Sequence, residues 1–149
     1  MDQKSETPPP APLPSTRHSL PIALIRARES VMAPIRLMLA DTGLTEQQWR
    51  VLRVLMESGP IDASQLANRA GLLAPSLTRI IQAMSKQGYI SRGPDPADRR
   101  RQVIAILPAG QRIIEANQAE AAAIAQSFRD RLGDADYDRL LTLLDQLIE

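Results

Sequence analysis

The fold of this chain can be inferred outward from residues 62–107, which read DASQLANRAGLLAPSLTRIIQAMSKQGYISRGPDPADRRRQVIAIL. Asp62 is an N-cap residue with a glutamine three positions later, and the short apolar face that follows ends at Gly71, which suits a left-handed stop. Pro75 suits the first position of a second helix, which we expect to end at Gly88. Two short helices joined by a turn form a helix-turn-helix.

Two strand-like runs follow the second helix and enclose a charged loop. Residues 89–92 and 102–107 have strand composition, whereas residues 93–101 hold prolines, aspartates and three consecutive arginines. Because Pro and Asp favour turns and oppose strands, the pattern predicts a β-hairpin with a basic loop. A helix-turn-helix followed by a basic hairpin indicates a winged helix-turn-helix. The second helix of that fold fits the major groove of DNA, and its hairpin reaches the adjacent minor groove.

The second helix leaves an outward row of hydrogen-bonding side chains when its apolar residues, Leu77, Ile80, Ile81 and Met84, face the core. The row is Ser76, Thr78, Arg79 and Gln82. Arg79 is the candidate for a bidentate contact to guanine. The alternative for Ser76 and Thr78 is ordinary solvation of a first helical turn.

The hairpin loop supplies a second group of candidate DNA-binding residues, Asp98, Arg99, Arg100 and Arg101. One carboxylate beside three guanidinium groups allows Asp98 to orient one arginine while another extends into a narrow minor groove. Neutralisation of phosphates without sequence specificity is the alternative.

Charge is unevenly distributed along the chain, although its 149 residues carry a net charge of only +1. Residues 62–101 hold seven basic and three acidic groups, a net +4, and residues 102–149 hold four and eight, a net −4. A basic segment within a near-neutral protein indicates a polyanion as partner of that segment, and a solvated charged loop is the alternative.

Composition argues against several classes of function. The chain has no Cys and a single histidine, His18. Disulfides and thiolate metal sites are therefore excluded, and little is left for a zinc site or a Ser/His/Asp triad. We expect no catalytic residue, metal or cofactor. With no apolar run near the roughly 18 residues of a membrane span and no secretory signal pattern, we expect a cytoplasmic protein without a membrane partner.

The segments that flank the motif are expected to be helical except at the N-terminus. Residues 1–17 are predicted to form a disordered tail, because five of the twelve prolines lie between residues 8 and 14. Apolar residues at steps of three and four predict a helix from residue 19 to about residue 40, and Pro34 predicts a kink or break near residues 31–33. Thr45 starts the next helix with a capping box. Its buried stripe is expected to be Trp49, Leu52, Leu55 and Met56.

A long helix and a terminal helix follow the hairpin. Pro108 opens the first, Gly133 ends it, and Asp134 is expected to cap the second. The apolar face of the second consists of Leu140, Leu141, Leu144, Leu147 and Ile148. That face is too rich for a terminal helix left in water, so it favours a dimer.

The hairpin resembles the wing signature of the MarR-type transcriptional regulators. Residues 95–100 read DPADRR, followed by alternating apolar residues and Gly110, and are similar to the pattern D-x-R-D-x-R then V-x-L-T-x-x-G. Ala97 departs from the arginine of that pattern, and Pro108 replaces the threonine. More narrowly, residues 19–24, 27–29, 44–50 and 75–78 resemble the branch that contains repressors of homoprotocatechuate degradation, in which a basic residue is expected in place of Ala74.

The resemblance covers about residues 19–149 and implies a mainly α fold with a small β-hairpin. Residues 45–107 would form a winged helix-turn-helix DNA-binding core, and residues 18–44 and 108–149 a helical dimerisation domain. The resemblance also implies a homodimer in which the first, fifth and sixth helices of both chains interlock. It implies binding to a pseudo-palindromic operator in double-stranded DNA and release by a small aromatic acid or related phenolic effector. Together these features indicate a repressor of an aromatic-compound catabolic operon.

The resemblance places the effector pocket between the dimerisation helices and the DNA-binding core. The candidate ligand-binding residues are Arg17, His18, Arg28, Trp49 and Arg53. An arginine would pair with a carboxylate, and an aromatic ring would pack on Trp49. The alternatives are a plain core role for Trp49 and an ion pair for Arg28, with a partner subunit or with Glu29. For the whole chain, the alternatives are a winged-helix module that binds a protein without operator recognition and, less favoured, a small hydrolase.

Overall fold

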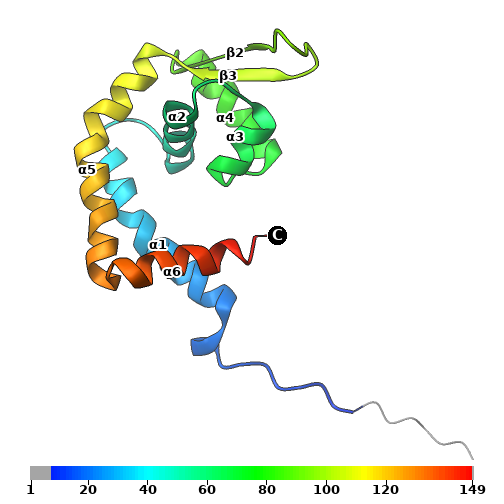
Figure 1. Cartoon of the computed structure of the whole chain (residues 1–149), viewed down its shortest axis with the longest axis vertical. Helices are drawn as coiled ribbons and strands as arrows, with labels where there is room; N and C mark the ends of the chain where they lie inside the picture. The colour runs from blue at the N-terminus through cyan, green and yellow to red at the C-terminus, as the bar shows by residue number, and fades with distance from the viewer. Residues whose placement is uncertain (1–7, 149) are drawn as a thin grey trace, which may run out of the picture. The chain divides into compact units, whose positions relative to one another are not determined.

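The computed structural model describes residues 8–148, and the chain divides into two compact units, residues 1–33 and 34–149. The elements are η1 (Thr16–His18), α1 (Leu20–Leu39), α2 (Glu46–Ser58), β1 (Ile61–Asp62), α3 (Ala63–Ala70), α4 (Ala74–Lys86), β2 (Ile90–Pro94), β3 (Gln102–Ile106), α5 (Pro108–Leu132) and α6 (Asp134–Asp145) (Figure 1). This order confirms the mainly α fold with a winged helix-turn-helix. None of the helices in the described part of the chain is long and apolar enough to cross a membrane.

The part of the chain up to the end of α1 differs from the sequence prediction in two places. The last two residues of the predicted tail, Thr16 and Arg17, belong to η1, a 3-10 helix whose cap Ser15 accepts a hydrogen bond from the Arg17 backbone, and disorder before this helix stays a prediction. Residues 1–7 of that prediction lie outside the described residues. The helix α1 is continuous through Pro34, so a break there is wrong, whereas the alternative of a kink stays a prediction. A proline deletes a single helical hydrogen bond, and the boundary between the two compact units falls directly before it.

The helix α2 starts at the predicted capping box. The Thr45 hydroxyl accepts from the Gln48 backbone at 3.2 Å, and the Gln48 side chain accepts from the Thr45 backbone at 3.1 Å. Trp49, Leu52 and Leu55 are buried as expected, but Met56 is 40% exposed, so its assignment to the core is wrong. Val51 and Val54 are buried in addition. Neighbouring elements therefore cover α2 over a wider face than its apolar stripe alone predicts.

The helix-turn-helix is built from the signals that its sequence carries. The Asp62 carboxylate accepts from the Gln65 backbone at 2.8 Å and caps α3. Gly71 ends α3 with φ of 64° and ψ of 43°, a left-handed conformation that a residue with a side chain adopts only at a cost. The core beneath the motif contains the fully buried side chains of Val51, Leu52, Leu55, Leu66, Leu77, Met84, Ile90 and Ile104.

The wing is part of a three-stranded antiparallel sheet with strand order β1-β3-β2. Ile90 lies opposite Ile106, and Pro94 lies opposite Gln102. The strand β1 was missed from the sequence because two residues carry no periodic pattern. At the base of the wing, a side chain on Gly110 would place its Cβ 2.6 Å from the Tyr89 carbonyl oxygen, so only glycine allows α5 to start this close to the sheet.

The junction of α5 and α6 differs from the prediction in its cap. Gly133 occupies the N-cap position of α6 with φ of 81°, so the assignment of Asp134 as the cap is wrong. The Asp134 carboxylate instead accepts a hydrogen bond from Arg129 at 3.3 Å, and Asp138 accepts from the same guanidinium at 3.1 Å. The guanidinium also lies 4.4 Å from the centre of the Tyr137 ring. An ion pair across the corner therefore replaces the expected side-chain cap.

The apolar face of α6 is open to solvent within this chain. Leu140, Leu141 and Leu143 on α6 are 43 to 48% exposed. Leu147 and Ile148, which the sequence placed on the same helix, follow its end at Asp145 and are 56% and 78% exposed. No residue of α6 is buried.

Candidate functional site

The outward face of α4 is formed as predicted. Leu77, Ile81 and Met84 are buried and Ile80 is partly buried, whereas the exposed residues are Ser76, Thr78, Arg79 and Gln82. The Thr78 hydroxyl donates to the Ala74 carbonyl oxygen at 3.2 Å, so it faces a partner in its own helix. Arg79 has no hydrogen-bond or ion-pair partner within residues 8–148. The helix α4 also contains no acidic residue, so nothing on it opposes the approach of a polyanion.

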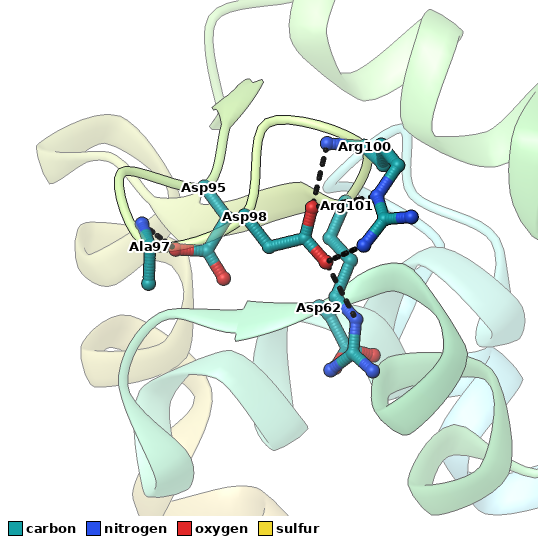
Figure 2. Close-up of polar contacts among 6 residues, drawn as sticks. All are labelled: Asp62, Asp95, Ala97, Asp98, Arg100 and Arg101. Carbon is teal, nitrogen blue, oxygen red and sulfur yellow. Dashed lines mark hydrogen bonds and ion pairs between the residues drawn. The ribbon is translucent and has the colours of Figure 1, made fainter.

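The wing loop is held in shape by Asp98 and Asp95 (Figure 2). Asp98 Oδ1 accepts from the Arg100 backbone and from Arg100 Nε, each at 3.1 Å. The hydrogen bond from the Arg100 side chain, and then that from its backbone, hold the pKa of the Asp98 carboxyl below its ordinary value. Asp95 Oδ1 accepts from the Ala97 backbone at 2.8 Å, and the Asp95 backbone donates to the Arg101 carbonyl oxygen at 2.9 Å.

Arg101 links the wing to the first helix of the motif. Its Nε lies 3.9 Å from Asp98 Oδ2, and its Nη1 lies 3.8 Å from Asp62 Oδ2. Asp62 also caps α3, so one carboxylate joins the helix start to the wing. Figure 2 shows the Arg101 side chain extending from the loop towards Asp62. This long-range pair was not recognised from the sequence, since no local pattern relates the two residues.

Arg99 is the arginine that the loop leaves available. It is exposed and has no partner among the residues that the structure describes, whereas Arg100 and Arg101 both contact Asp98. Asp98 therefore holds two arginines, Arg100 and Arg101, and Arg99 is the one that extends from the loop without a partner among the described residues. Contact of these three arginines with DNA stays a prediction.

A cavity of about 520 Å³ lies between α2 and α5, within the range of small-molecule sites. Its wall consists of Trp49, Arg53, Met56, Glu57, Ile114, Gln118, Ala121, Ala122 and Ala125. Trp49 is 4% exposed and belongs to the hydrophobic core, so the core role weighed from the sequence is present, and a ligand role for Trp49 stays a prediction. The α5 wall was missed because alanines along a helix give no signal of binding.

The five candidate ligand residues are divided between the two compact units. Trp49 and Arg53 both line the cavity. Arg17 and His18 lie in η1 and Arg28 lies on α1, within residues 1–33. Arg28 Nη1 is 3.5 Å from Glu29 Oε1, so the ion pair considered as an alternative is present. A ligand role for all five residues stays a prediction.

Comparison with known proteins assigns this architecture to a family. The MarR family model matches residues 44–101, the segment from the start of α2 to the wing loop. The chain is 35% identical over 138 residues to the HTH-type transcriptional regulator FarR of Neisseria gonorrhoeae, covering 93% of this chain and 92% of that protein. The chain belongs to the MarR family. It is therefore a DNA-binding transcriptional regulator, and the named relatives are regulators, not enzymes.

Two further MarR-family comparisons confirm the narrower resemblance. The chain is 35% identical over 130 residues to the homoprotocatechuate degradative operon repressor of Escherichia coli, covering 87% of this chain and 88% of that protein. It is 34% identical to NadR, solved in complex with 4-hydroxyphenylacetate, with a TM-score of 0.79 over 92% of this chain and 97% of that chain.

Proposed function

We propose that this regulator is a homodimeric repressor of a catabolic operon that leaves its operator when an aromatic carboxylate binds. The helix α4 and the wing loop would contact a pseudo-palindromic operator in the cytoplasm. The observation that carries the proposal is the cavity behind the winged helix-turn-helix, which combines an indole, a guanidinium and an apolar wall. A ligand there would bias the DNA-competent population through its different affinity for the two states.

The lining of the cavity favours a hydroxyaryl carboxylate. Arg53 supplies a cation for the carboxylate, and Trp49 supplies a ring on which an aromatic ring can pack. Glu57 and Gln118 are acceptors that a phenolic hydroxyl can reach as a donor. The relatives agree with this chemistry, since one represses a homoprotocatechuate degradative operon and another was solved with 4-hydroxyphenylacetate.

The exposed face of α6 supports the dimer. Leu140, Leu141 and Leu143 on α6 are 43 to 48% exposed in the single chain, and Leu147 and Ile148 directly after the helix are 56% and 78% exposed. A second copy would cover this apolar surface. A symmetric dimer also presents two recognition helices to successive half-sites about one DNA turn apart. We therefore propose that residues 18–44 and 108–149 carry the dimer contacts and residues 45–107 the DNA contacts.

The test is a paired titration with 4-hydroxyphenylacetate. Trp49 is the only tryptophan, so its fluorescence reports on the cavity directly. Quenching and release from a preferred duplex are expected to share one midpoint, because the two equilibria are linked. The neutral amide of the same compound is the matched control and should bind more weakly. Release without quenching, or at a different midpoint, would place the effector site elsewhere.

Two arginine variants locate the carboxylate. Arg53→Gln should reduce the preference for the acid over the amide while leaving binding to DNA without ligand unchanged. Arg28→Ala should weaken binding of the acid but spare operator binding without ligand. Loss of dimerisation by Arg28→Ala without any ligand would instead assign Arg28 to a structural ion pair.

A further inference from the structure

The turn between α3 and α4 ends in a leucine that the fold leaves in water. Leu73 occupies the N-cap position of α4 and is 77% exposed. Its neighbour Leu72 is partly buried against the hydrophobic core. Helices favour Ser, Thr, Asp or Asn at the N-cap because those side chains accept a backbone hydrogen bond, and α4 has no such side-chain cap. In the single chain, the Leu73 side chain thus neither caps the helix by a hydrogen bond nor packs in the core.

The surroundings of Leu73 indicate what would cover it. Ala74 and Pro75 follow it and are exposed, so the leading end of α4 is apolar for three residues. The exposed polar residues Ser76 and Arg79 come next, on a helix without acidic side chains. The apolar end of α4 thus adjoins the polar, non-acidic surface that carries Ser76 and Arg79. Such a surface suits a polyanion better than it suits an apolar face of another protein.

We propose that Leu73 is a specificity-determining residue that packs on the 5-methyl group of a thymine in each operator half-site. The inference rests on the operator function proposed above. The N-terminal residues of a recognition helix contact base edges in the major groove. The thymine methyl is the apolar feature of that groove, and apolar side chains read it by contact. Covering the methyl with Leu73 would remove both from water.

The experiment removes the methyl group and the leucine separately and together. A preferred duplex is selected from random sequences, and each thymine is then replaced by deoxyuridine, which lacks only the 5-methyl group. For the unaltered protein, one symmetric pair of positions should weaken binding by about fourfold per half-site, the factor that corresponds to ~0.8 kcal/mol for one buried methylene-sized group. Leu73→Ala should bind the thymine and deoxyuridine duplexes equally at that position.

Three controls separate this contact from other effects. Leu13→Ala alters a leucine that is 93% exposed outside the DNA-binding core and should retain the discrimination. Leu73→Ala should keep the melting temperature and dimeric state of the unaltered protein. It should also keep the affinity for random DNA, where phosphate contacts dominate.

The outcomes distinguish the inference from the function on which it rests. If deoxyuridine changes the affinity of the unaltered protein and of Leu73→Ala equally at every position, the role of Leu73 is overturned. The proposed operator function is not affected by that result. A change in dimeric state caused by Leu73→Ala also overturns the role of Leu73, because Leu73 would then contact protein. If no duplex is preferred over random DNA, both the operator function and the inference fail.

Discussion

Removing the wing arginines one at a time is expected to separate an arginine that contacts phosphate from one that positions the wing. Arg99 is exposed and has no partner within residues 8–148. Arg101 is held 3.9 Å from Asp98 and 3.8 Å from Asp62. Arg99→Ala should therefore remove a charge available to DNA, whereas Arg101→Ala should release the wing from the first helix of the motif.

The magnitude follows from counterion release. Each phosphate neutralised contributes about 0.9 to the slope of log affinity against log salt. A dimer has two wings, so Arg99→Ala should lower the magnitude of that slope by about two. Arg101 is already paired with carboxylates, so Arg101→Ala should change the slope by at most about one. It should nevertheless weaken binding to every duplex, because the wing loses its link to Asp62. Arg99 and Arg100 removed together should lower the slope at least as much as Arg99 alone.

The assay is fluorescence anisotropy of a labelled duplex between about 50 and 200 mM salt, with a preferred and a random sequence. Arg131→Ala is the matched control, because Arg131 is an exposed arginine at the far end of α5 from the wing. An unchanged slope for Arg99→Ala would refute contact of Arg99 with phosphate. Equal slope changes for Arg99→Ala and Arg101→Ala would refute the distinction between the two roles.

Three further outcomes are expected. Arg79→Ala should cost about 1–3 kcal/mol on the preferred duplex and relax selection at one base pair, whereas equal loss on random DNA would show that Arg79 only positions the protein. Leu144→Asp with Leu147→Asp should yield monomeric or unfolded protein by light scattering, because it places unpaired charges in an apolar interface, and a folded dimer would contradict the role of α6. The pKa of Asp98, followed by NMR, should lie below its ordinary value of 3.8. The stabilisation of the wing by this carboxylate is therefore present above that value and is lost as pH falls through the depressed pKa. Arg100→Ala should raise the pKa, and an unshifted pKa in the unaltered protein would argue against the loop geometry.

Local signals account for what could be predicted correctly. The capping box of α2 and the Asp62 cap of α3 are interactions between residues three apart, and the left-handed Gly71 depends on a single residue. Each is therefore visible in a short stretch of sequence. The spacing of apolar residues correctly predicted the buried face of α4, and the turn residues and basic charge of the hairpin predicted the wing. These features together predicted the fold class and the outward row on α4.

Contacts between distant segments decided the rest. Met56 belongs to the apolar stripe of α2 but lies at a cavity whose other wall comes from α5, so its exposure depends on a helix far along the chain. The role of Arg101 depends on antiparallel pairing that brings β1 beside β3 and thus Asp62 beside the wing. Gly133, not Asp134, is the N-cap of α6, and Asp134 pairs with Arg129 across the corner between two helices. Sequence patterns encode interactions over one helical turn or one strand, whereas these outcomes depend on which surfaces meet when the chain folds.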